Sequence, residues 1–213
     1  MNFSYIIFRR KILIFNLLLI CIQSSAALSA DRAEQLYSLC VACHGAQGEG
    51  NKSLEAPAIA GLPLWYLQKQ LMNFRNGVRG LHPADGAGMR MRPMARTIPS
   101  EKDLMAVGEL VSKMKPVDQP ATVEGSPVKG MNAYAVCSTC HGLKGEGNEA
   151  LGAPQLVGQS DWYLLKQLKN FKEGIRGANP AIDPMGATMA PMAATLADEQ
   201  AMKDVVSYIH KLK

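Results

Sequence analysis

Cysteine and histidine occur twice in this chain as Cys-x-x-Cys-His, with the histidine directly after the second cysteine of each pair. The two motifs comprise Cys40, Cys43 and His44, and Cys137, Cys140 and His141. This spacing is typical of covalent haem attachment, in which two thiols form thioethers with the vinyl groups and the histidine donates a ring nitrogen to the iron. The motifs therefore predict two covalently bound haem c groups, with His44 and His141 as axial ligands.

Zinc binding and thiol redox chemistry are the alternatives for these cysteines. Two Cys-x-x-Cys pairs can bind zinc, and a single pair can exchange between dithiol and disulfide. Zinc does not require a histidine after both pairs, and a thioredoxin-like site needs a βαβ context that the sequence lacks. The glycine-rich stretch Gly45 to Gly50 follows a helical pattern rather than a strand, which favours a tight turn beside the porphyrin over a nucleotide-binding loop.

The second axial ligand of each iron must come from elsewhere in the chain. No histidine stands at the position equivalent to His82 or His210 relative to the other cysteine motif, whereas methionines recur at equivalent positions after both motifs. The recurring pairs are Met91 with Met189, and Met94 with Met192. We predict that Met91 and Met189 bind the irons from a loop before the last helix, with Met94 and Met192 as the alternative. Histidine and methionine together fill both axial positions, which predicts an electron carrier rather than an enzyme.

An internal repeat relates the two motifs. An offset of 97 maps Gly48–Asn51 onto Gly145–Asn148 and Trp65–Leu71 onto Trp162–Leu168, and it becomes 98 at the methionines. Prolines and glycine concentrate between the copies, which is typical of a linker. We therefore predict a first domain over 31–115, a linker over 116–128 and a second domain over 129–213.

Residues 1–30 resemble a targeting segment. Arg9, Arg10 and Lys11 precede an apolar run that ends near Ile22, and small residues follow it. We expect a signal peptide that is cleaved and a periplasmic protein, because the run is shorter than the roughly 20 residues of a membrane-spanning helix. The alternative is a leader that is retained as an anchor. Without this segment the chain holds 20 basic and 18 acidic residues, and no basic patch indicates nucleic-acid binding.

Helical periodicity dominates the remaining sequence, and no segment alternates like a strand. We expect three helices in each copy: one leading into the cysteine motif, one over Leu64–Asn76 and its repeat, and one starting after Ser100 or Asp198. The predicted fold class is all-α, with two tandem domains whose few helices wrap around a covalently bound haem. Each copy is small for a core of side chains alone, so the haem would supply apolar mass.

Several other residues suit positions around a haem. We expect the carbonyl groups of Pro57 and Pro154 to accept the Nδ1 proton of His44 and His141, with ordinary loop prolines as the alternative. Arg79 and Arg176 are candidates for pairing with the haem propionates, although a solvated arginine after a helix is an equal alternative.

Together, the paired motifs and the repeated methionines resemble the class I cytochromes c, in particular the tandem two-haem cytochromes of the c4 type. The likeness covers 31–213 and implies two domains related by approximate two-fold symmetry, with histidine–methionine iron in each. It also implies a ligand methionine seven residues before the residue that opens the last helix, which matches Met91 before Ile98 and Met189 before Leu196.

The resemblance implies electron transfer between a respiratory donor and an acceptor such as a terminal oxidase. The alternative is an electron-accepting subunit of a dehydrogenase complex, and a two-haem peroxidase or thiosulfate-oxidising enzyme ranks third. Redox proteins are the expected partners, nucleic acid is not, and peripheral membrane association is compatible with the sequence. The first copy carries Arg90, Arg92 and Arg96 where we aligned Ala187, Ala190 and Ala194 in the second, so we hypothesise a more basic first haem edge.

Overall fold

The computed structural model describes residues 31–212, and the expected signal peptide over 1–30 lies outside this range. Residues 31–44 are helical and are followed by η1 (Lys52–Leu54), α2 (Leu64–Arg75), α3 (Gly86–Thr97) and α4 (Glu101–Ser112). The second domain repeats this order as α5 (Pro127–His141), η2 (Glu149–Leu151), α6 (Asp161–Lys172), α7 (Pro184–Ala194) and α8 (Glu199–Ile209). No strand forms within 31–212, which confirms the all-α prediction.

The prediction of three helices per copy was wrong, because α3 and α7 form over the methionine-bearing segments that we expected to be loops. Asp85 and Asp183 cap the starts of these helices by accepting from the N–H of Gly88 and Gly186. Each helix contains an internal proline, Pro93 or Pro191. Proline removes one backbone hydrogen bond and disfavours a helix interior, but a strong N-cap and packing against the neighbouring helix offset that cost.

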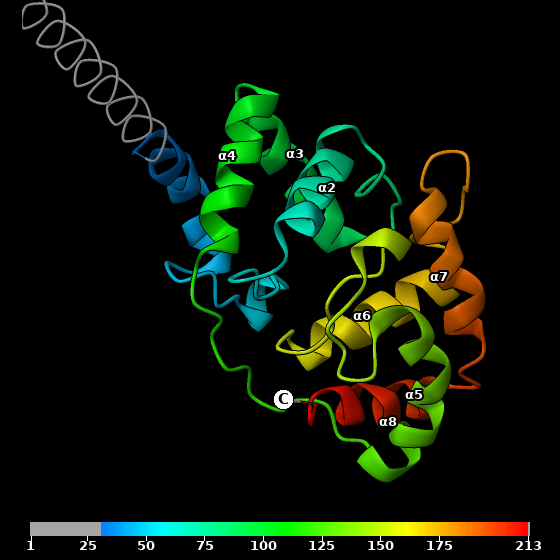
Figure 1. The fold of residues 1–213 in the computed structure, drawn as a ribbon. Helices are drawn as coiled ribbons and strands as arrows, with labels where there is room; N and C mark the ends of the chain where they lie inside the picture. The colour runs from blue at the N-terminus through cyan, green and yellow to red at the C-terminus, as the bar shows by residue number, and fades with distance from the viewer. Residues whose placement is uncertain (1–30, 213) are drawn as a thin grey trace, which may run out of the picture.

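The two domains lie side by side, joined by a segment that runs from the end of α4 to the start of α5 (Figure 1). In the first domain α2 contacts α3 and α4, and in the second α6 contacts α7 and α8. Helix α5 begins at Pro127, inside the stretch expected to be the linker, because Ser126 caps its first turn and proline suits the first helical position. No helix within 31–212 has the length and hydropathy needed to cross a membrane.

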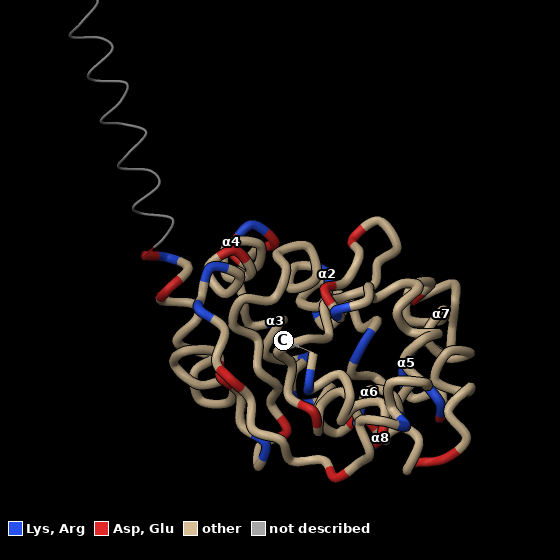
Figure 2. The backbone as a smooth tube through the Cα atoms, turned by 60° about the horizontal axis from the view of Figure 1, so that its bottom comes forward, with Lys and Arg blue, Asp and Glu red and all other residues tan. Residues whose placement is uncertain are grey.

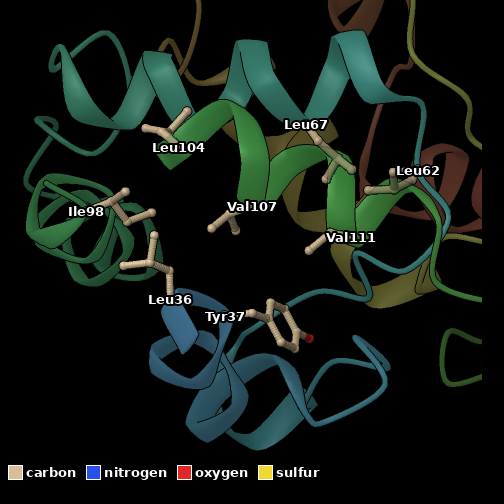
Figure 3. Packing of buried hydrophobic residues seen from close by; sticks show 8 residues of the cluster. All are labelled: Leu36, Tyr37, Leu62, Leu67, Ile98, Leu104, Val107 and Val111. Carbon is tan, nitrogen blue, oxygen red and sulfur yellow. The ribbon is translucent and has the colours of Figure 1, made fainter. Parts of the chain in front are cut away.

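Each domain has a small apolar core beneath its helices. In the first domain the side chains of the core converge from the first helix, α2 and α4 (Figure 3). Its members are Leu36, Tyr37, Leu62, Leu67, Ile98, Leu104, Val107 and Val111. The second core is built around Tyr134, Val205 and Val206, where α5 packs on α8. Both cores lie next to the cysteine motifs, so they hold those motifs in place.

Candidate haem sites

One open cavity in each domain brings the predicted site residues together. Cys40, Cys43, His44 and Met91 line the first cavity. Cys137, His141 and Met189 line the second, whereas Cys140 is exposed and is not part of that lining. The cavities hold about 1270 and 1040 Å³, including the space at their mouths.

Both histidines are buried and hydrogen-bonded as the sequence predicted. The Nδ1 atom of His44 lies 2.9 Å from the carbonyl oxygen of Pro57, and that of His141 lies 2.7 Å from the carbonyl of Pro154. A carbonyl only accepts, so Nδ1 carries the proton and the Nε2 lone pair is available to a metal. Burial lowers the pKa of both imidazoles, which favours the neutral form that iron requires.

The turn after each histidine fixes its position through backbone contacts. The N–H of Gly50 donates to the carbonyl of His44 at 2.8 Å, and the N–H of Gly147 does the same for His141. The hydroxyl of Tyr37 donates to the carbonyl of Gly45 at 2.8 Å. The glycine-rich stretch is therefore a tight turn around the histidine, as predicted, and not a nucleotide-binding loop.

Burial makes one thiol of each pair a poor zinc ligand and a poor nucleophile. Burial raises the pKa of Cys40 to about 11 and also raises the pKa of Cys137, so both are protonated at neutral pH. Thiolates are the reactive and metal-binding form of cysteine. Within the described residues, no three or more His, Cys, Asp or Glu side chains cluster in a way that suits a metal ion.

The methionines differ between the two cavities. Met91 and Met94 both line the first cavity, but the second is lined by Met185 and Met189. Met192 is 39% exposed and lies outside the lining, so the alternative ligand that we considered for the second domain is replaced there by Met185. Sequence comparison missed Met185 because its counterpart in the first domain is Ala87.

Two arginines meet at the boundary between the domains. Arg79 donates to Gln70 (2.7 Å) and Gln167 (3.3 Å), and Arg176 donates to Gln167 (2.8 Å) and Gln70 (3.2 Å). We call these four residues the arginine–glutamine ring. Each guanidinium also lies over a phenylalanine ring of its own domain, at 4.4 Å for Phe74 and 4.6 Å for Phe171.

The ring lacks the negative charge that two buried guanidinium groups need. The Nε atoms of Arg79 and Arg176 are buried without a hydrogen-bond partner. Burial and the nearby charge of Arg79 lower the pKa of Arg176. Buried charges are normally paired, and arginine suits carboxylates. Since Arg79 lines the first cavity and Arg176 the second, ligands with carboxylates near this boundary fit both sites, as haem with its propionates does.

Two helical domains, each with a Cys-x-x-Cys-His motif and a methionine at an apolar cavity, define a two-domain c-type cytochrome that carries two covalently bound haem c groups. The chain belongs to the cytochrome c family, whose family model matches residues 30–115 and again 127–213. The two matched ranges cover most of the chain, and each of them contains one Cys-x-x-Cys-His motif.

Individual relatives support the same class. Cytochrome c4 of Azotobacter vinelandii is 30% identical over 197 residues, which covers 88% of this chain and 90% of the relative. A thiosulfate dehydrogenase electron acceptor of Thiomonas intermedia (strain K12) is 34% identical over 175 residues, covering 76% and 73%. The crystal structure of reduced recombinant cytochrome c4 from Pseudomonas stutzeri aligns with a TM-score of 0.67 and 29% identity, covering 86% of this chain and 98% of that one.

Proposed function

We propose that the chain holds one haem c through Cys40 and Cys43 with His44 and Met91 as axial ligands, and a second through Cys137 and Cys140 with His141 and Met189. The observation that carries this assignment is the shared cavity: in each domain a buried, Nδ1-bonded histidine and a methionine from another helix line one apolar space. The proposed first domain is 31–115, and the proposed second domain begins with α5 at Pro127, which shortens the predicted linker to 116–126.

When bound, the haem iron takes up and releases one electron. The chain's residues favour this use over substrate chemistry, because the imidazole and the thioether proposed for each site would bind the iron on both sides and leave no position for a substrate. The apolar side chains that line each cavity would limit the access of water to a bound haem. Apolar cores near the cysteine motifs keep the ligands in fixed positions.

Electrons would pass between the two haems across the domain boundary. Tyr66, Gln70, Tyr163 and Gln167 line both cavities, so the cavities share one wall. In that wall the arginine–glutamine ring would neutralise propionates from both sides. Electrons would therefore enter the protein through the haem of one domain and leave it through the haem of the other.

The proposed setting is the periplasm, with transfer from a respiratory donor to an acceptor such as a terminal oxidase. In the view of Figure 2, Lys and Arg as well as Asp and Glu residues lie along both domains. The second candidate, an electron-accepting subunit of a dehydrogenase complex, is favoured by the similarity to the Thiomonas thiosulfate dehydrogenase electron acceptor. Purification at high salt distinguishes the two functions. A dehydrogenase that copurifies with the chain would support the subunit, and a chain that purifies alone would support the free carrier.

The ligand assignment is tested by the optical spectrum of the protein matured with haem. We expect two haems per chain and a long-wavelength sulfur-to-iron charge-transfer band that falls by about half in Met91→Ala and in Met189→Ala. Met192→Ala is the matched control, because its side chain lies outside the cavity, and it should leave the band unchanged. A band that is unchanged in Met189→Ala and falls by about half in Met185→Ala would assign the second iron to Met185 instead.

A further inference from the structure

The two cavity walls differ at one repeated position. Glu55 follows η1 with a φ of 55°, the only positive φ of a non-glycine residue in the described chain. Its counterpart Gly152 has a φ of 64°, and a Cβ there would come within 2.7 Å of the Sδ atom of Met185. A side chain at this position in the second domain would therefore displace the end of the Met185 side chain. In the first domain the smaller Ala87 replaces Met185, and the space admits Glu55.

Glu55 connects three elements from both domains. One carboxylate oxygen accepts from Arg90 of α3 at 2.8 Å, and the other accepts from Lys166 of α6, in the second domain. Arg90 also donates to the carbonyl of Leu54 at 3.2 Å. We call Arg90, Glu55 and Lys166 the Glu55 bridge. It joins the helix that carries Met91 to the other domain.

The bridge is specific to the first cavity. All three of its members line that cavity, and none lines the second. The second cavity is lined instead by Lys69, the repeat counterpart of Lys166, for which no ion pair forms within residues 31–212. The N-caps of α3 and α7, Asp85 and Asp183, are 98 residues apart, so the structural counterpart of Arg90 is Thr188. The sequence alignment of Arg90 with Ala187 was therefore wrong by one residue.

A left-handed backbone at a non-glycine residue costs about 1–2 kcal/mol, so something must favour Glu55 over glycine here. Simple stabilisation is a weak reason, because the Glu55 side chain is 43% exposed and solvent screens its ion pairs. Hydrogen bonds from Lys166 and Arg90 lower the pKa of Glu55, so the carboxylate stays charged at neutral pH. The bridge therefore keeps one negative and two positive charges at the wall of one haem site.

We propose that the charges of the Glu55 bridge, at the wall of the first cavity, set the reduction potential of the first haem apart from that of the second. The proposal rests on the proposed function, since it assumes one haem in each cavity. Local positive charge favours the reduced state of the iron, and local negative charge favours the oxidised state. Charge at the bridge thus acts on the first haem, and a residue of the second domain contributes to it.

The test is a redox titration of the two-haem protein, followed through its visible bands. The Met189→His variant first assigns the two redox waves. Replacing the thioether by imidazole lowers the potential of the second haem, so the wave that does not shift belongs to the first haem. Glu55→Gln should raise the potential of the first haem, Lys166→Gln should lower it, and the double variant should return near the wild-type value. Each single change should shift the reduction equilibrium at least threefold, where tenfold equals 59 mV for one electron.

Matched variants separate this role from others. Lys69→Gln should lower the potential of the second haem only. Glu109→Gln, which breaks an exposed ion pair with Lys113 at the end of α4, should change neither potential. If Glu55→Gln and Lys166→Gln both lower the first potential and the double variant lowers it further, the bridge is merely structural and the proposal fails. It also fails if neither variant shifts the first haem. Two unchanged waves in Met189→His would instead refute the ligand assignment in the proposed function.

Discussion

At the scale of single residues, the turn after each histidine depends on glycine. Gly50 has a φ of 82°, and a Cβ there would lie 2.5 Å from the backbone nitrogen of Ala58. Gly174 has a similar φ of 67°, but its Cβ would meet only the side chain of Ala178 at 3.8 Å. The two positions therefore separate the cost of backbone conformation from the cost of a clash.

We predict that Gly50→Ala destabilises the protein more than Gly174→Ala does. The left-handed conformation should cost about 1–2 kcal/mol in both variants. The clash at Gly50 should add roughly 1–3 kcal/mol, because the backbone of residues 56–58 cannot move without disturbing the carbonyl that holds His44. Guanidinium chloride unfolding of the two variants measures the difference, and equal midpoints would contradict the prediction.

At the scale of elements, the linker is fixed to the second domain by the start of α6. The carboxylate of Asp161, 1% exposed, accepts from the N–H groups of Thr122 (2.5 Å) and Val123 (2.8 Å) and from the hydroxyl of Thr122 (2.6 Å). Burial opposes the charge of Asp161, but the hydrogen bonds outweigh it and lower the pKa of the carboxyl below its ordinary value.

Asp161→Asn should release the linker and cost about 3 kcal/mol of unfolding free energy, because an amide cannot accept all these bonds. The folded pKa lies below the unfolded one, so the wild type keeps this contribution above the unfolded value near pH 4 and loses it as the pH falls through the folded value. Amide hydrogen exchange over 116–126 should be faster in the variant at neutral pH. Unchanged protection would mean that other contacts hold the linker.

At the scale of the whole molecule, the arginine–glutamine ring makes the two domains depend on each other. Each glutamine oxygen accepts from both arginines, so removing one glutamine leaves both guanidinium groups short of a partner. Leaving buried charged donors unsatisfied costs more than the loss of an ordinary hydrogen bond.

We predict that Gln167→Met uncouples the unfolding of the domains. Calorimetry of the haem-loaded variant should resolve two transitions where the wild type shows one. Gln68→Met is the control, since Gln68 donates only within its own domain, to the carbonyl of Met105, and it should leave a single transition. Two transitions in the wild type would show that the ring does not couple the domains.

The sequence alone determined the features that depend on local chemistry. The Cys-x-x-Cys-His motif is specific enough to predict the two haem groups. The offset between the copies predicted the repeat, and helical periodicity predicted the all-α class. The sequence also predicted the contacts of His44 with Pro57 and of His141 with Pro154. The tertiary structure decided what depends on packing between distant segments. Helices form around Pro93 and Pro191 because caps and neighbours compensate for proline, Met185 enters the second cavity opposite Gly152, and Arg79 and Arg176 share two glutamines. No spacing within one segment encodes these contacts, since each requires two chain segments brought together by the fold.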